Sequence, residues 1–142
     1  MEIYSLPLFK EEYEKLIKKN SYKNLTEELF NYFHGKEVSE VLSGTRLNHS
    51  KDEPYIKKRL SGSGGYRVYY LVIIKNQKAY LMFIHPKTGS LGSDDITDES
   101  KAKIYKDILE AIKSNQLYKV SLTKDHITFE YIKTTVSSSS VQ

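Results

Sequence analysis

Three stretches rich in strand-forming residues follow one another along residues 55–85, and short polar turns separate them. They cover residues 55–60, 66–74 and 79–85, with turns at 61–65 and 75–78. Runs of β-branched and aromatic residues bounded by Gly, Ser and Asn predict strands, and turns this short join antiparallel neighbours. The chain is therefore expected to fold around an antiparallel meander. Because residues 66–74 carry little polar content, we expect this strand to be central and covered on both faces.

The segments on either side of the meander have their own periodicities. They predict a strand over 2–6, a helix from Pro7 to about Asn20, a second helix from Asn24 to Gly35, a helix from Thr97 to about Ser114, and a hairpin formed by 117–122 and 126–132. The apolar face of the first helix is expected to consist of Phe9, Tyr13, Leu16 and Ile17. Asn24 and Glu27 have the spacing of a capping box.

The resulting order, β-α-α-β-β-β-α with an extra C-terminal hairpin, predicts an α+β fold. We expect the two N-terminal helices to pack on a small twisted antiparallel sheet, with the helices on one face. The 142 residues suit one domain with a real core. We place that domain at residues 1–133 and expect the serine-rich residues 134–142 to be a flexible tail.

Composition narrows the possible chemistry and location. The absence of cysteine excludes disulfides and thiolate metal sites, and the four histidines lack the spacing of a metal site. We therefore expect neither a metal nor another cofactor. The longest apolar run, residues 68–74, is far shorter than the roughly 18 residues of a membrane helix, and the N-terminus lacks the features of a signal peptide. These features predict a cytoplasmic protein with no membrane partner.

Positive charge is concentrated in the middle of the chain. The formal net charge is +4, yet residues 1–40 carry six Lys and eight Glu. Residues 45–70 carry six Lys and Arg against two acidic residues. Such a stretch favours a polyanionic partner, because Lys and Arg release phosphate counterions on binding. The alternative is a solvated strand edge that lysines protect from aggregation.

Five short motifs follow one another in the chain: LSGTRL at 42–47, KKRL at 57–60, SGGYRVYY at 63–70, YLMFIHPK at 80–87 and DITDE at 95–99. Their order resembles that of the RelE/ParE toxin superfamily, and in particular its RelE/HigB branch. The resemblance covers about residues 2–114 and rests on these motifs together, since each alone is weak. Two departures stand out: a longer loop at 88–94, and the hairpin at 117–132, which extends past the compact family fold.

The resemblance implies the toxin of a type II toxin–antitoxin system. Such a toxin is a metal-free mRNA endoribonuclease that depends on the ribosome and inhibits translation, so its partners would be mRNA, the ribosome and a cognate antitoxin. It also implies a catalytic cation at Lys87, and cations on the strand 57–60 that contact RNA and serve in proton transfer. A C-terminal tyrosine near the scissile phosphate is typical of the family, and Tyr118 and Tyr131 are the candidates here.

Metal-free cleavage of RNA needs an acid, a base and cations that stabilise charge on the phosphate. Arg67 is the expected phosphate clamp, because it follows the glycine turn on a strand that is otherwise almost free of charge. The alternative is an ion pair with Glu53 or a C-terminal carboxylate. His85 can act as base or acid at neutral pH; the alternative is a strand-end histidine that caps a backbone carbonyl.

The candidate residues form two sets. We expect Arg67, Lys57, Lys87 and His85 to be catalytic, and Arg46, Lys58, Arg59 and Tyr66 to bind RNA. Lys57 and Arg59 should share one face of their strand while Lys58 points to the other. The general acid and base remain open among Lys57, His85, Lys87 and a tyrosine.

Two other functions fit the same fold. One is a non-catalytic binding module, for example a ParE-like inhibitor of DNA gyrase or another protein-binding toxin, because fold does not fix function. The set of cations that includes Arg67 and Lys57 favours the nuclease over this module. The other is a domain with a different target, which the 88–94 loop and the C-terminal hairpin would serve.

Overall fold

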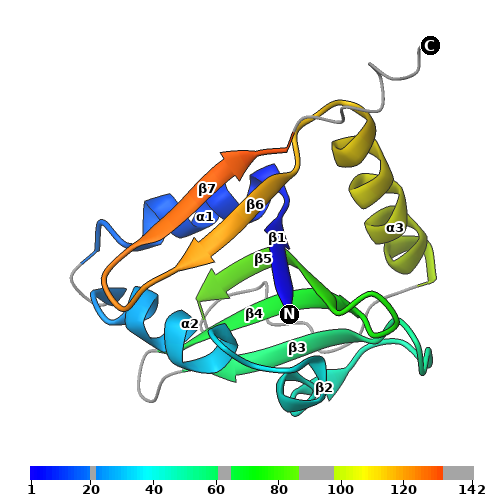
Figure 1. Ribbon diagram of the computed structural model, residues 1–142, viewed down its shortest axis with the longest axis horizontal. Helices are drawn as coiled ribbons and strands as arrows, with labels where there is room; N and C mark the ends of the chain where they lie inside the picture. The colour runs from blue at the N-terminus through cyan, green and yellow to red at the C-terminus, as the bar shows by residue number, and fades with distance from the viewer. Residues whose placement is uncertain (20–21, 61–64, 87–97, 133–142) are drawn as a thin grey trace.

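The computed structural model describes residues 1–19, 22–60, 65–86 and 98–132. Its elements are β1 (Glu2–Ser5), α1 (Pro7–Leu16), α2 (Leu25–Phe33), the 3-10 helix η2 (Val38–Val41), β2 (Thr45–Arg46), β3 (Tyr55–Leu60), β4 (Tyr66–Ile73), β5 (Lys78–Pro86), α3 (Asp98–Lys113), β6 (Tyr118–Leu122) and β7 (Ile127–Tyr131) (Figure 1). The expectations for the 61–64 turn, Lys87, the 88–94 loop, the Thr97 cap and the 134–142 tail lie outside the described residues.

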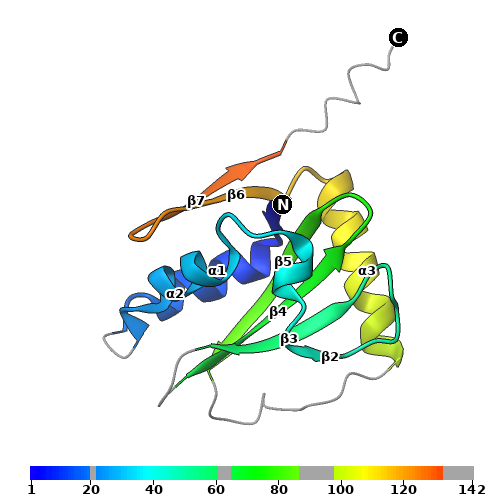
Figure 2. The ribbon, with the colours of Figure 1, turned by 60° about the horizontal axis from the view of Figure 1, so that its bottom comes forward.

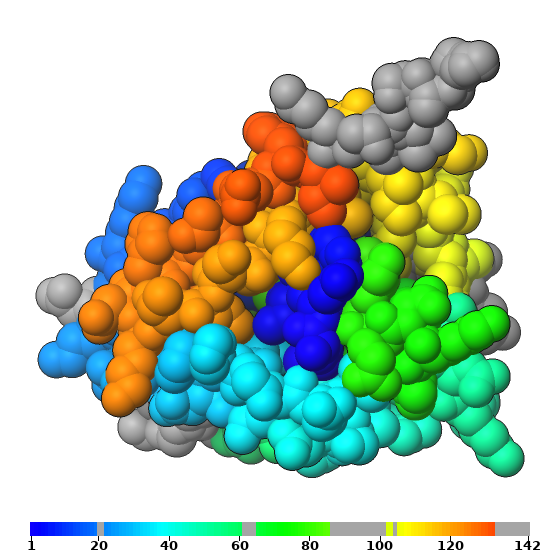
Figure 3. Space-filling model, in the orientation of Figure 1, coloured from blue at the N-terminus to red at the C-terminus, as the bar shows by residue number. Residues whose placement is uncertain are grey.

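The described strands form one seven-stranded sheet in the order β2-β3-β4-β5-β1-β6-β7, which confirms the α+β class. Antiparallel pairing of β3 with β4 and of β4 with β5 confirms the meander. β1 lies between β5 and β6, parallel to the first and antiparallel to the second, so the sheet is mixed. The C-terminal hairpin therefore continues the central sheet and is not an appendage to it, and in the space-filling view its surface runs on from that of β1 (Figure 3).

Helices cover both faces of this sheet, so the expectation of helices on one face was wrong. α1 and α2 share a core with Val68, Tyr70 and Leu81 of the meander and with Val120 and Ile127 of the hairpin. The sheet curves so that the meander and the hairpin enclose these two helices (Figure 2). α3 packs on the opposite face, where it shares a second core with residues of β3, β4 and β5.

Strand β4 is buried on both faces, as its composition predicted. Its alternate side chains enter the two cores: Tyr66, Val68, Tyr70 and Val72 point toward α1 and α2, and Tyr69 and Leu71 lie on the α3 side. The strand is interior, between β3 and β5, although β5 is the middle strand of the sheet. Because β4 lies inside the sheet, a charged residue on it has to find a partner, a ligand or water.

The helix ends follow local chemistry, with two corrections. Pro7 opens α1, where its missing N–H costs no hydrogen bond, but α1 ends at Leu16 and leaves Ile17 41% exposed. Asn24 makes no side-chain cap, and the capping box lies at Glu37 and Glu40 of η2. Gly35, at φ +68°, ends the α2 segment as expected. Within the described part of the chain, no helix is long and apolar enough to cross a membrane.

Candidate functional site

The register of β3, β4 and β5 aligns basic residues in a row across the sheet. Arg59 lies opposite Arg67, and Arg67 lies opposite His85. Residues directly opposite each other on neighbouring strands point to the same face, so the three side chains share one face. We call them the Arg–Arg–His row.

A second row runs beside the first on the same face. Lys57 lies opposite Tyr69, and Tyr69 opposite Phe83. The ends of β3 and β5 and the start of β4 lie away from the body of α3 in both ribbon views (Figures 1 and 2). The Arg–Arg–His row therefore occupies the end of the face that α3 leaves open.

Arg67 has the electrostatic environment of an anion site. Two like charges directly opposite each other destabilise a strand pair, and Arg59 and Arg67 are such a pair. The Arg67 Nη1 atom is buried and has no hydrogen-bond partner among the described residues. No salt bridge joins Arg67 to Glu53, although the structure describes both. A bound anion would satisfy Nη1 and offset the repulsion between the two guanidinium groups.

A polar hollow of about 410 Å³ lies at this end of the sheet. Its lining is Ser43, Gly44, Thr45, Lys57, Lys58, Arg59 and Arg67. Gly44 brings the 43–45 segment close to β3, because a Cβ there would lie 2.5 Å from the carbonyl oxygen of Lys57. The LSGTRL motif therefore forms one wall of the hollow, and its glycine is needed for close approach.

His85 is held by a carboxylate from α1. Its Nδ1 lies 3.2 Å from Oε2 of Glu12, and the two side chains are 18% and 22% exposed. Glu12 Oε1 accepts the backbone N–H of Ile84 at 3.0 Å, which fixes the carboxylate at the edge of β5. An Nδ1–H that donates to Glu12 leaves Nε2 as the proton acceptor. Among the described residues, no backbone carbonyl accepts a hydrogen bond from the His85 side chain, and the pairing with Glu12 suits a general base.

Aromatic rings complete the surroundings of His85. Phe83 stacks on the imidazole with ring centroids 5.9 Å apart and planes at 13°. Tyr69 meets the imidazole at 5.7 Å in an edge-on arrangement. These contacts restrict the rotation of His85 and shield one side of it from water.

No protein-family model matches this chain, and no curated protein does. The resemblance to the RelE/ParE toxins therefore rests on the motifs and their order alone.

The structure separates the predicted site residues other than Tyr66 into three groups. Lys57, Arg59, Arg67 and His85 come together on one face. Lys58 points to the other face, where its Nζ contacts Ser43 Oγ at 3.1 Å and lies over the Tyr32 ring, and Arg46 pairs with Ile56 and shares that other face. Lys87 falls outside the described residues.

Tyr66 and the C-terminal tyrosines do not join the site. Tyr66 is 2% exposed in the core beneath α2, where burial raises the pKa of its hydroxyl, so the expectation that it contacts RNA was wrong. Tyr118 and Tyr131 pair with each other on the hairpin, which the sheet order separates from β4 by β5 and β1. Tyr69 is the tyrosine that lies beside His85.

Sequence reasoning missed three residues of the site. Tyr69 and Phe83 each lie two positions from a predicted site residue on the same strand, so strand alternation alone could have found them. Glu12 lies on α1, far from His85 in the sequence, and its spacing from Phe9 marks it only as a residue at the edge of the buried face. No local signal links it to His85.

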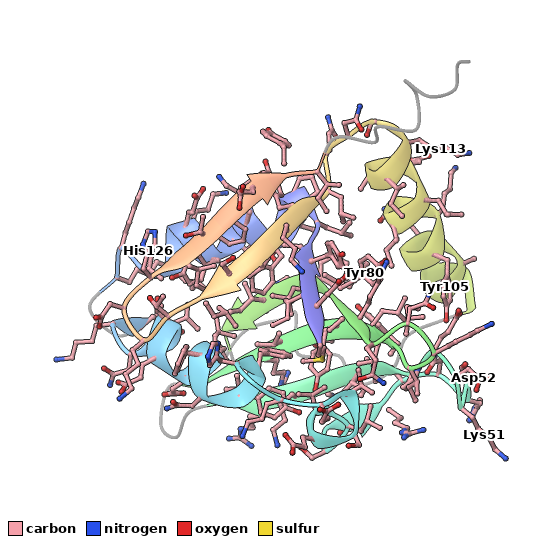
Figure 4. All side chains as sticks on the ribbon, viewed as in Figure 1. Lys51, Asp52, Tyr80, Tyr105, Lys113 and His126 are labelled. Carbon is pink, nitrogen blue, oxygen red and sulfur yellow. The ribbon has the colours of Figure 1, made fainter. Side chains whose placement is uncertain are left out.

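No group of three or more metal-binding side chains occurs within the described ranges. The His126 side chain lies at the β6–β7 turn, across the molecule from Tyr105 and Lys113 on α3 (Figure 4). The cations around the hollow suit an anionic ligand.

Proposed function

We propose that this chain is a toxin-type endoribonuclease, which cleaves mRNA on the ribosome without a metal ion and is neutralised by an antitoxin. The observation that carries the proposal is the Arg–Arg–His row, in which two guanidinium groups lie beside a histidine oriented by a carboxylate. Two fixed cations suit a phosphate, and an oriented imidazole suits proton transfer. The His85–Glu12 pair favours a nuclease over a surface that only binds an acidic partner.

The proposed reaction is transesterification at a phosphodiester. Nε2 of His85 takes the proton of the ribose 2′-hydroxyl, and the 2′-oxygen attacks the neighbouring phosphorus. The bond between phosphorus and the 5′-oxygen breaks, which gives a 2′,3′-cyclic phosphate and a 5′-hydroxyl. Arg59 and Arg67 stabilise the extra negative charge on the phosphate oxygens in the transition state. Lys57, which shares their face, donates the proton that the departing 5′-oxygen takes up.

Glu12 is a positioning residue in this scheme. Its carboxylate holds Nδ1 of His85 while the Ile84 N–H holds the carboxylate. An imidazolium formed during the reaction gains a charge-assisted hydrogen bond to Glu12. The same logic orients histidines in other acid–base sites, where the carboxylate fixes the tautomer and stabilises the protonated ring.

The partners follow from the resemblance and from charge. The ribosome would present mRNA as a single strand to the basic end of the sheet. An antitoxin that covers Lys57, Arg59 and Arg67 should itself be acidic at the contact, because a neutral segment would take these cations out of water without compensating their charge. Such partners commonly lay a helix or a strand across the surface they cover.

Induced expression of wild-type protein and matched variants in a bacterial host tests the proposal. We expect growth arrest with new message 5′-ends inside translated frames for the wild type, and neither effect for Arg67→Ala or His85→Ala. Arg46→Ala and His126→Ala serve as matched controls, because Arg46 faces the other side of the sheet and His126 lies in the β6–β7 turn. Both controls should remain toxic.

Three results would contradict the proposal. Arrest without new 5′-ends would point to a binding module on the same fold, such as a gyrase inhibitor. Folded, soluble Arg67→Ala protein with full toxicity would remove the phosphate clamp. Loss of toxicity in both controls would show that the basic row is not the determinant.

A further inference from the structure

A largely apolar groove of about 620 Å³ lies next to the Arg–Arg–His row. Leu6 and Leu8 at the start of α1, Ala111 on α3 and Phe83 on β5 supply apolar walls. The groove lies at the C-terminal end of α3, the end that Lys113 marks in Figure 4. Its volume falls in the range of about 300–1,000 Å³ typical of small-molecule sites.

Phe83 is the wall that the groove and the catalytic row share. Its ring lines the groove, stacks on His85 at 5.9 Å and lies 6.1 Å from Tyr69. A nucleotide whose phosphate lies on Arg67 therefore has an aromatic ring and an apolar recess directly beside it.

The charges of the two regions differ. The row carries two guanidinium groups, whereas the α3 side of the groove carries the carboxylates of Asp107 and Glu110 and the ammonium group of Lys113. Asp107 already pairs with Lys103 at 2.8 Å, so Glu110 is the carboxylate with capacity for a new hydrogen bond. Carboxylates repel phosphate but accept hydrogen bonds from exocyclic amino groups of bases.

We propose that this groove is a nucleobase subsite, in which a base adjoining the scissile phosphate stacks on Phe83 and a base that carries an amino group is preferred over uracil. The inference rests on the proposed function and adds the part of the substrate that the site reads. Stacking on an aromatic ring accepts any base, and the Glu110 carboxylate then supplies the preference.

Binding of a 2′-O-methyl RNA oligonucleotide tests the subsite, because that strand has no 2′-hydroxyl to attack the phosphate. An abasic position is moved along the strand and the affinity is measured at each step. We expect at least about a fivefold loss at one position, the lower end of what base stacking contributes. Phe83→Leu should lower the affinity for the intact strand by the same factor. It should not lower the affinity for the abasic strand any further, because the substitution and the abasic position remove the same stacking interaction.

Leu109→Ala is the control, since Leu109 lies on α3, is 56% exposed and does not line the groove; it should bind as the wild type does. Glu110→Gln should reduce the preference for adenine or cytosine over uracil at the same position. Wild-type protein without that preference would overturn the choice of an amino-bearing base.

The result that would overturn the subsite is a flat abasic scan while Arg67→Met still weakens binding. That result would support the phosphate site and would indicate that the groove binds apolar side chains of a protein partner instead of a base. If the wild type binds the strand neither free nor on the ribosome, the proposed function fails together with the subsite.

Discussion

Replacement of Arg67 by Met should stabilise the fold while it abolishes RNA cleavage. Met keeps most of the length and apolar volume of the side chain but removes its charge and its buried Nη1 atom. A buried polar atom without a partner costs about 1–3 kcal/mol, and like charges opposite each other on paired strands cost about 0.2–1 kcal/mol. Because Arg67 as a whole is only half-buried, we expect the lower part of that range, about 1–2 kcal/mol of added stability.

Ionic strength should change this gain only in part. Neighbouring strands lie about 4.8 Å apart, well inside the Debye length of about 10 Å at 0.1 M salt. Repulsion between Arg59 and Arg67 is therefore incompletely screened, and the gain should be larger at low salt. Phosphate should stabilise the wild type by binding the folded state and should have much less effect on Arg67→Met.

Urea unfolding in phosphate-free buffer, with and without added phosphate, measures both effects. Lys51→Met is the control, because Lys51 is an exposed cation outside the hollow, and its stability should change little. A less stable Arg67→Met protein would refute the argument that Arg67 is held at an energetic cost to the fold. Equal stabilisation of wild type and variant by phosphate would refute the anion site.

Three further predictions follow from the contacts. Glu12→Gln should lower the rate of RNA cleavage by about 10- to 100-fold, the loss seen when a metal-binding histidine loses its hydrogen-bond partner, with RNA affinity unchanged. Single-turnover cleavage beside a binding titration measures this, and a parallel loss of affinity would contradict a positioning role. Gly44→Ala should cost about 1–3 kcal/mol of stability, since its Cβ would lie 2.5 Å from a β3 carbonyl oxygen. Thermal unfolding measures this, and an unchanged unfolding midpoint would show that the 43–45 segment shifts freely. Burial raises the pKa of Tyr55, Tyr66 and Tyr70. These hydroxyls stay protonated in the folded state and ionise near pH 10 in the unfolded chain, so the free energy of unfolding should be unchanged below about pH 10 and should fall as the pH rises above it. Tyrosinate absorbance during alkaline unfolding measures this. Ionisation of all 12 tyrosines before unfolding would contradict it.

Strand and helix positions were largely predictable from the sequence. Tyr55–Leu60 is the strand that was expected, and β4 ends one residue before the predicted Ile74. Period-2 and period-3.6 patterns are local properties, so they survive in one sequence without knowledge of the fold. Two predictions about helix ends were wrong. Ile17 fits the helical pattern but lies after the end of α1, and Asn24 has the spacing of a capping box but makes no side-chain cap.

The candidate site was predictable only within single strands. Alternation placed Lys57 and Arg59 on one face and Lys58 on the other, as the contacts of Lys58 with Ser43 and Tyr32 bear out. The same alternation does not say which face of β4 is covered by α1 and α2. For that reason Tyr66 was expected at the site and lies in the core.

The elements, the meander and the cations on it can be derived from the sequence, because they depend on neighbours in the chain. The register that sets Arg59 opposite Arg67 and Arg67 opposite His85 is established only when the strands pair in the folded protein. The tertiary structure also placed β1 between β5 and β6, and brought Glu12 of α1 to the edge of β5 beside His85. Strand register and helix docking depend on the burial of whole strand and helix faces in both cores. The free energy of that burial comes from residues throughout the chain, so no short motif encodes it.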